Sequence, residues 1–117
     1  MPRPLPGDER GRLGHLMDFI RAHLAASHTI GSLAARAAMS PRTLQRELSG
    51  ATGQAPCEWI VGERIERAKE LLETTRLTAQ GVAARVGMGS AESLRHHFRR
   101  RVGTPPGEYR RRFGRRG

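Results

Sequence analysis

The sequence predicts an all-α protein, in which a long linker helix joins two helix-turn-helix subdomains and about seven helices form in total. Three observations support this prediction. Residues 29–59 return in altered form as residues 78–109. The composition is 37% hydrophobic with one Trp, one Tyr and three Phe, which suits a small aliphatic helical core. Alternating runs of β-branched residues, which would indicate strands, are absent from the sequence.

The two copies of the repeat agree mainly at apolar, Gly and Pro positions. An offset of 49 residues aligns positions 29–39 with 78–88, and after one inserted residue the offset becomes 50. The differences lie between Leu44 and Leu48 and between Leu94 and Phe98. A shared core would therefore present a different surface in each copy. Paired positions include Thr29 with Thr78, Met39 with Met88, Leu44 with Leu94, Gly53 with Gly103, Pro56 with Pro106 and Trp59 with Tyr109.

The first subdomain is expected over residues 13–54. Before it, residues 1–12 are expected to form a flexible leader or linker remnant, because Pro2, Pro4 and Pro6 argue against a helix. An amphipathic stripe predicts a helix over 13–27, where apolar residues recur at helical spacing: Leu13, Leu16, Met17, Ile20 and Leu24.

Two shorter helices complete this first lobe. Thr29 is expected to cap a helix over 30–38, and Ser40 to cap the next, with Pro41 in its first turn. The inward positions of that second helix are Leu44 and Leu48. A helix, a tight turn and another helix result.

The linker helix is expected within residues 55–75, running from about residue 58 to residue 74 and roughly 25 Å long. The second subdomain is expected over 76–113, with Thr78 opening one helix, Ser90 capping a second that ends at Val102, and 105–106 opening the last. Residues 114–117 are expected to be a frayed basic tail.

The charge predicts a polyanionic partner. The net charge is +10, from 21 basic and 11 acidic side chains. No apolar run approaches the length of a spanning helix and no signal-peptide core follows Met1, so we expect no membrane partner and a cytoplasmic, nucleoid-associated location. The single cysteine, Cys57, is expected to be a small packing residue. We expect no metal site, no cofactor and no catalytic residue.

Helical geometry selects two outward faces. With Leu44 and Leu48 buried, the polar residues Arg42, Gln45, Arg46 and Ser49 face out. With Leu94 and Phe98 buried, the outward residues are Glu92, Arg95, His96 and Arg99. Arg can pair with guanine, Gln with adenine and Glu with cytosine in the major groove of DNA. The alternative interpretation is that these side chains are only solvated.

Three stretches of the chain resemble the DNA-binding domain of the AraC/XylS family of bacterial transcription regulators. They are "LAARAAMSPRTLQRELSGATGQAP", "RIERAKELLETT" and "VAARVGMGSAESLRHHFRRRVGTPPGEYRRRF". The resemblance covers the chain from about Leu13 to Phe113. Within the family, the chain is most similar to members with a DJ-1/PfpI-like N-terminal domain. The resemblance implies two recognition helices that enter successive major grooves.

Carried over by position, the resemblance places base contacts on both recognition helices. Family members commonly have Phe where Leu48 stands, which should alter packing but not the reading face. They commonly have a cationic residue where His96 stands, so the second helix is expected to read bases weakly or to serve mainly as a phosphate anchor. The expected base-reading residues are Arg42, Gln45, Arg46, Ala91, Glu92, Ser93 and His96. The expected phosphate contacts are Ser40, Ser49, Ser90, Arg95, Arg99, Arg100 and Arg111.

The leading hypothesis is a sequence-specific regulator of transcription that binds double-stranded DNA and is not an enzyme. RNA polymerase, and a sensor domain in a longer parent chain, are its expected partners, and the isolated domain is expected to be monomeric. One alternative is the DNA-binding module of an alkylation-repair enzyme, which would use Cys57. Another is a helical protein that binds nucleic acid nonspecifically through charge.

Overall fold

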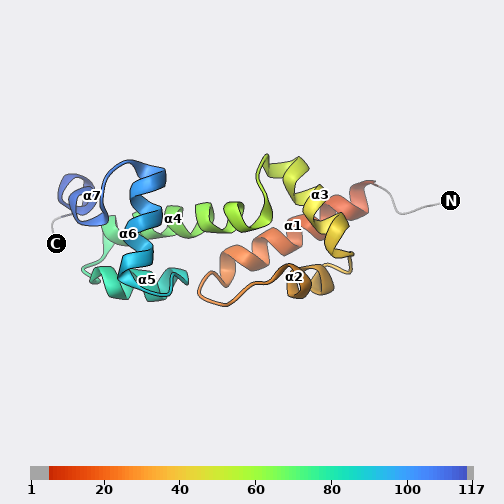
Figure 1. Cartoon of the computed structure of the whole chain (residues 1–117), viewed down its shortest axis with the longest axis horizontal. Helices are drawn as coiled ribbons and strands as arrows, with labels where there is room; N and C mark the ends of the chain where they lie inside the picture. Colours follow the sequence, from red (N-terminus) through yellow and green to blue (C-terminus); the bar gives the residue numbers. More distant parts are fainter. Residues whose placement is uncertain (1–5, 116–117) are drawn as a thin grey trace. The chain divides into compact units, whose positions relative to one another are not determined.

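All regular structure in the part of the chain that the structure describes is α-helical. The computed structural model describes the backbone of residues 6–115 and the side chains of residues 11–115. The all-α prediction is confirmed, and no helix among these residues is both long and apolar enough to cross a membrane. The helices, labelled in Figure 1, are α1 (Pro6–Ala22), α2 (Ile30–Arg36), α3 (Pro41–Thr52), α4 (Pro56–Thr74), α5 (Ala79–Val86), α6 (Ala91–Val102) and α7 (Pro106–Phe113).

Helix α1 differs from its predicted bounds at both ends. It begins at Pro6, inside the segment expected to be a flexible leader, and ends at Ala22, before the expected end at residue 27. Proline is compatible with the first turn of a helix because the N–H group it lacks has no partner there. The prediction of a flexible leader was therefore wrong from Pro6 onward, and residues 1–5 of the expected leader lie outside the described residues.

The chain forms two compact units. Unit 1 comprises Met1–His23 and Ser27–Trp59, and unit 2 comprises Leu24–Ala26 and Ile60–Gly117. The boundary falls inside α4, so this helix contributes its first turn to unit 1 and the rest to unit 2. A division into lobes 13–54 and 76–113 with a separate linker at 55–75 stays a prediction.

Unit 1 has an aliphatic core with one large aromatic residue. Leu44 and Leu48 of α3 are fully buried, as their spacing predicts, and Trp59 at the start of α4 is 6% exposed. The guanidinium group of Arg21 lies 5.3 Å from the centre of the Trp59 ring, so this edge of the core is closed by a cation–π contact. The other buried core residues are Leu13, Leu16, Ile20, Leu33, Ala34 and Ala37.

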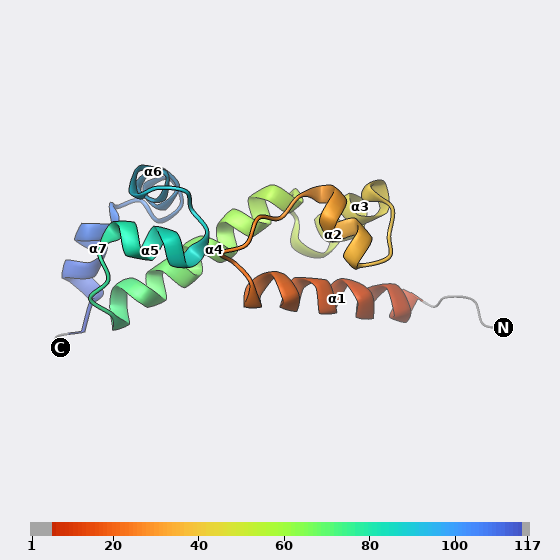
Figure 2. The ribbon, with the colours of Figure 1, turned by 90° about the horizontal axis from the view of Figure 1, so that it is seen from below.

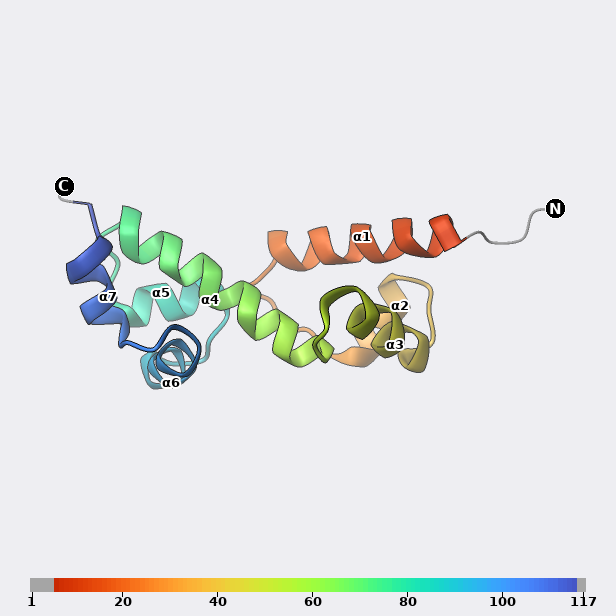
Figure 3. The same ribbon diagram turned by 90° about the horizontal axis from the view of Figure 1, so that it is seen from above.

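Unit 2 packs α5, α6 and α7 around the C-terminal part of α4, as Figures 2 and 3 show. Phe98 of α6 meets Tyr109 of α7 edge to face, with ring centres 5.4 Å apart. The hydroxyl of Tyr109 donates to the carboxylate of Glu73 on α4. Trp59 and Tyr109, which occupy equivalent positions of the repeat, are both buried.

The repeat is also visible in the backbone. The N–H of Met39 donates to the carbonyl of Ala34 at 2.9 Å, and the N–H of Met88 donates to that of Ala83 at 2.9 Å. Both long helices of the repeat end at a left-handed glycine, Gly53 with φ 75° and Gly103 with φ 92°. Each unit therefore contains a helix-turn-helix whose turn makes the same backbone hydrogen bond, with one residue more in the second copy.

The part of the expected basic tail that the structure describes is fixed by a backbone hydrogen bond. The N–H of Arg115 donates to the carbonyl of Glu73 at 2.9 Å, which ties the chain to the end of α4. The expectation of a frayed tail was wrong at this residue, because α4 ends with unpaired carbonyl groups that accept hydrogen bonds. Residues 116–117 lie outside the described part of the chain.

Candidate nucleic-acid interface

Helix α3 presents one polar face of the interface. Ser40 caps it by accepting the N–H of Thr43 at 3.1 Å, and Pro41 occupies its first position. With Leu44 and Leu48 buried, the side chains of Arg42, Gln45 and Arg46 are all exposed, as predicted. Arg46 contacts the carboxylate of Glu47 at 3.6 Å, but 64% of its side chain remains exposed.

Helix α6 presents the second face, which is more basic. It is capped by Ser90, which accepts the N–H of Ser93 at 3.0 Å. The structure brings five of the predicted residues together as exposed side chains on this helix: Glu92, Arg95, His96, Arg99 and Arg100. Three arginines in the last turn also interact favourably with the C-terminal end of the helix dipole: Arg99, Arg100 and Arg101.

Several predicted residues are not on these exposed faces. Ala91 and Ser93 are half-buried, and the Ser93 hydroxyl lies 4.0 Å from the sulfur of Met88. Ser49, on α3, is half-buried as well. The rotation of 100° per residue directs these side chains toward the neighbouring turn and core. Their low exposure therefore does not support the predicted DNA contacts.

The capping serines are already engaged within the protein. The Ser40 hydroxyl accepts from one backbone group and donates to the hydroxyl of Thr43 at 3.0 Å. Ser90 is half-buried. Their contribution to anion binding would come through the positive end of the helix rather than through a free hydroxyl.

Arg111 lies apart from the α6 face. It lines a surface pocket of about 400 Å³ at the end of α4, together with Arg76, Arg110 and Arg115. Figures 2 and 3 show α6 and the C-terminal end of α4 on opposite sides of unit 2. The predicted phosphate contact of Arg111 therefore has no support from its position.

One residue that supports the interface was missed from the sequence. The side-chain oxygen of Gln80, on α5, accepts the N–H of Ala91 at 3.2 Å. This contact ties the start of α6 to the preceding helix. The repeat carries no signal for it, because Gly31 stands at the corresponding place in the first copy.

The expectation for Cys57 was wrong. Its side chain is exposed on the first turn of α4, next to the buried Pro56. Helical rotation places consecutive residues about 100° apart, so Pro56 and Trp59 take the buried side and Cys57 does not.

The rings of His96 and His97 lie edge to face, with ring centres 5.0 Å apart. Among the described residues no group of three metal-binding side chains comes together.

Comparison with known proteins gives consistent results. A family model described as a helix-turn-helix domain matches residues 33–112. The HTH-type transcriptional regulator Rv1931c of Mycobacterium tuberculosis is 43% identical over 110 residues, which cover 94% of this chain and 38% of that protein. The arabinose operon regulatory protein of Salmonella typhimurium is 33% identical over 106 residues, which cover 90% of this chain and 37% of that protein. The chain thus spans less than two fifths of the length of either relative.

Among solved structures, one of the most similar is the DNA-binding domain of AdpA, a global transcriptional factor, in complex with a target DNA. It is 38% identical in sequence, with a TM-score of 0.84, and the match covers 87% of this chain and 92% of that one. The C-terminal domain of AraT, a response regulator from Geobacillus stearothermophilus, is 26% identical with a TM-score of 0.84, covering 98% and 92% of the two chains.

Proposed function

Because this chain belongs to the AraC/XylS family of helix-turn-helix DNA-binding domains, we propose that it is the DNA-reading part of a bacterial transcription regulator. It binds a specific double-stranded site through α3 and α6, which enter successive major grooves. The observation that carries the proposal is that each unit has a helix-turn-helix whose second helix exposes a polar face suited to base edges.

The two faces are proposed to have different tasks. Helix α3 exposes Arg42, Gln45 and Arg46, which have the donor and acceptor groups for guanine and adenine edges. Helix α6 exposes Glu92 and His96 beside its arginines, so its base contacts are fewer and its phosphate contacts through Arg95, Arg99 and Arg100 are more numerous. Helix α3 mainly specifies the site and α6 mainly holds the duplex.

The whole protein is proposed to act by binding rather than by catalysis, in the cytoplasm and on the nucleoid, since the relatives named above are transcriptional regulators. Because those relatives are longer than this chain, a sensor domain in the parent protein is part of the proposal, as is contact with RNA polymerase. A DJ-1/PfpI-like sensor stays a prediction. The isolated domain is proposed to be monomeric.

The decisive experiment is selection of bound sequences from random duplex DNA, followed by quantitative binding of the Arg46→Ala variant. We expect the variant to lose about 1 to 3 kcal/mol of affinity for the selected site and little for random DNA, since Arg46 reads a base edge. Arg85→Ala, an exposed arginine on α5, is the matched control. Equal losses on both DNAs would remove Arg46 from base reading and support the nonspecific alternative.

The alkylation-repair alternative makes a different prediction. The exposed thiol of Cys57 is the group that would accept an alkyl residue from damaged DNA. Intact-mass spectrometry after incubation with methylated duplex would then show a gain of one methyl group that Cys57→Ser abolishes. We expect no mass change in either protein.

A further inference from the structure

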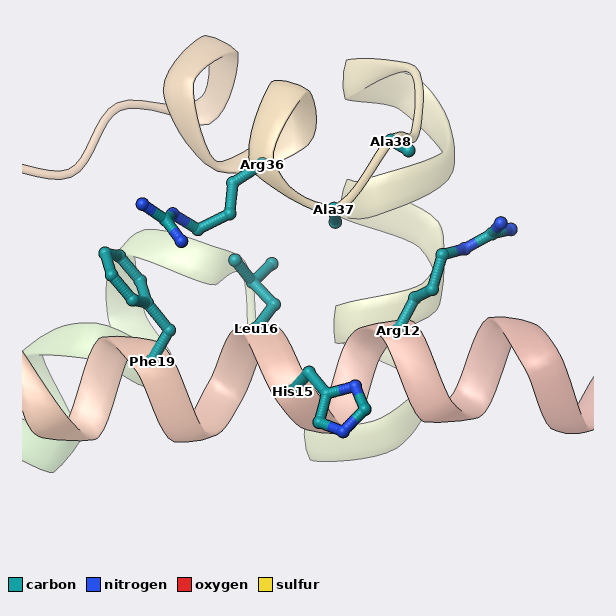
Figure 4. A pocket seen from close by; sticks show the side chains of 7 residues that line it. All are labelled: Arg12, His15, Leu16, Phe19, Arg36, Ala37 and Ala38. Atoms are coloured by element: carbon teal, nitrogen blue, oxygen red, sulfur yellow. The ribbon is translucent and has the colours of Figure 1, made fainter.

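A groove between α1 and α2 of unit 1 has no role in the proposed reading of DNA. It has a volume of about 250 Å³ and is the groove drawn in Figure 4. Leu16 forms its apolar floor and cationic side chains stand around it. We call it the α1–α2 groove, and its lining residues are Arg12, His15, Leu16, Phe19, Arg36, Ala37 and Ala38.

The two arginines of the groove are exposed. The guanidinium group of Arg36 lies 3.6 Å above the centre of the Phe19 ring, which holds it in place at the wall (Figure 4). Both Arg12 and Arg36 are exposed, and neither forms an ion pair with an acidic side chain that the structure describes. A planar guanidinium fixed in this way is well suited to a carboxylate.

The second copy of the repeat shows what such a place can hold. The offset of 49 that aligns residues 29–39 with 78–88 carries Ala38 onto Gly87. In unit 2 the turn Leu24–Ala26 lies directly against Gly87. Arg64 donates to the carbonyl of Leu24 at 3.1 Å and to that of Ala26 at 2.9 Å.

The difference at one backbone position explains why only one copy is filled. A Cβ on Gly87 would lie 2.2 Å from the carbonyl oxygen of Leu24, so the bound turn requires glycine. In unit 1 the same place is Ala38, which keeps the left-handed backbone with φ 56° and carries a methyl group. That methyl group keeps a backbone from approaching as closely, so an occupant must reach the cations with a side chain.

From these observations we propose that the α1–α2 groove is a docking site for an acidic peptide segment of a partner protein. One carboxylate of the segment pairs with Arg36 and a second acidic side chain reaches Arg12, at the other end of the groove (Figure 4), while an adjacent apolar side chain covers Leu16. The groove is small by the standard of small-molecule sites, which suits one or two side chains of a peptide. No residue of α3 lines this groove, so docking leaves Arg42, Gln45 and Arg46 open to DNA.

The test is a nuclear magnetic resonance titration of the isotopically labelled chain with two acetylated, amidated peptides. One has the sequence GLDELG and the other, GLNQLG, is its uncharged counterpart. We expect saturable shifts of the amides of Leu16, Ala37 and Ala38 with the acidic peptide, and none with the neutral one. Equal shifts with both peptides, or no saturation at concentrations on the order of millimolar, would overturn the proposal.

Matched variants localise the effect. Arg12→Ala combined with Arg36→Ala should weaken binding of the acidic peptide by at least about tenfold, because two charge-assisted contacts are lost. Arg85→Ala, at the repeat counterpart of Arg36, should leave it unchanged. Arg36→Gln removes the charge but keeps a shorter polar side chain and should also weaken binding, and the dispersion of the amide spectrum reports whether each variant stays folded.

The same proteins separate this proposal from DNA reading. The double variant should keep its affinity for the selected duplex, whereas Arg46→Ala should keep its affinity for the peptide. If the double variant loses DNA affinity and not peptide affinity, the groove meets phosphate and the peptide proposal fails, while the proposed function stands.

Discussion

At the scale of single residues, the surroundings of Tyr109 raise the pKa of its hydroxyl. Burial raises the pKa of its hydroxyl to about 12, and the hydrogen bond to Glu73 and the charges of Glu73 and Glu66 act in the same direction. The neutral hydroxyl donates to the Glu73 carboxylate, and ionisation would turn that contact into repulsion. Because the pKa is raised above its ordinary value of 10.0, the stabilisation is complete below pH 10 and is lost as the pH rises toward 12.

Tyr109 is the only tyrosine of the chain, so tyrosinate absorbance reports on it alone. In a titration to high pH we expect ionisation near pH 12 in the folded protein. Glu73→Gln should lower the apparent pKa, since the negative charge is removed, but not to the ordinary value, since burial remains. Glu70→Gln, whose partner is Arg67, is the control and should change little. Half-ionisation near pH 10 with helical circular dichroism intact would contradict this account.

At the scale of elements, the left-handed glycines that end the helices differ in how much space surrounds them. Gly53 and Gly87 both have left-handed backbones, with φ 75° and φ 82°. A Cβ at Gly53 would meet nothing within 4 Å, whereas one at Gly87 would lie 2.2 Å from the carbonyl oxygen of Leu24. Backbone strain is therefore common to both positions, and a steric clash is added only at Gly87.

This difference predicts the stability of three variants. Gly53→Ala should lower the free energy of unfolding by about 1 kcal/mol through strain alone. Gly87→Ala should lower it by about 2 to 5 kcal/mol, because the turn Leu24–Ala26 must also move. Gly89→Ala, which would meet nothing within 4 Å and has an ordinary φ, should change it by no more than about 0.5 kcal/mol. Urea unfolding measures all three, and equal losses for Gly53→Ala and Gly87→Ala would refute the clash.

At the scale of the whole molecule, the surplus of positive charge governs how affinity depends on salt. Each phosphate contact that an arginine makes releases a condensed cation, which steepens the salt dependence of binding. The exposed arginines of α6 lie on the proposed DNA side of unit 2, whereas Arg111 lies in the pocket at the end of α4. The two sets of arginines should therefore differ in their effect on DNA affinity.

Arg99→Ala should weaken binding to selected and random DNA alike and reduce the slope of log affinity against log salt by about 0.9. Arg111→Ala is a matched arginine deletion and should leave the slope unchanged. Affinities measured over a series of salt concentrations decide the matter. A slope that changes with Arg111 and not with Arg99 would move the phosphate contacts to the α4–α7 end of unit 2.

The sequence by itself determined the fold class, the repeat, the capping residues of α2, α3, α5 and α6, and the exposure of most recognition residues. These follow from local rules: hydroxyl residues cap helices, and a 100° step divides each helix into a buried and an exposed face. The resemblance to a family placed residues 33–112, which the family model matches, in the right group of proteins.

Only the tertiary structure decided where the turn at Leu24–Ala26 lies, and with it the need for glycine at Gly87. It also decided that Gln80 holds the start of α6, that Ser93 turns inward, that Cys57 is exposed and that Arg111 lies apart from α6. Contacts of this kind join residues that are distant in the chain or depend on which neighbour fills a space. A local sequence pattern does not show which distant residues pack beside an element. The two copies of the motif therefore fold alike but have different neighbours.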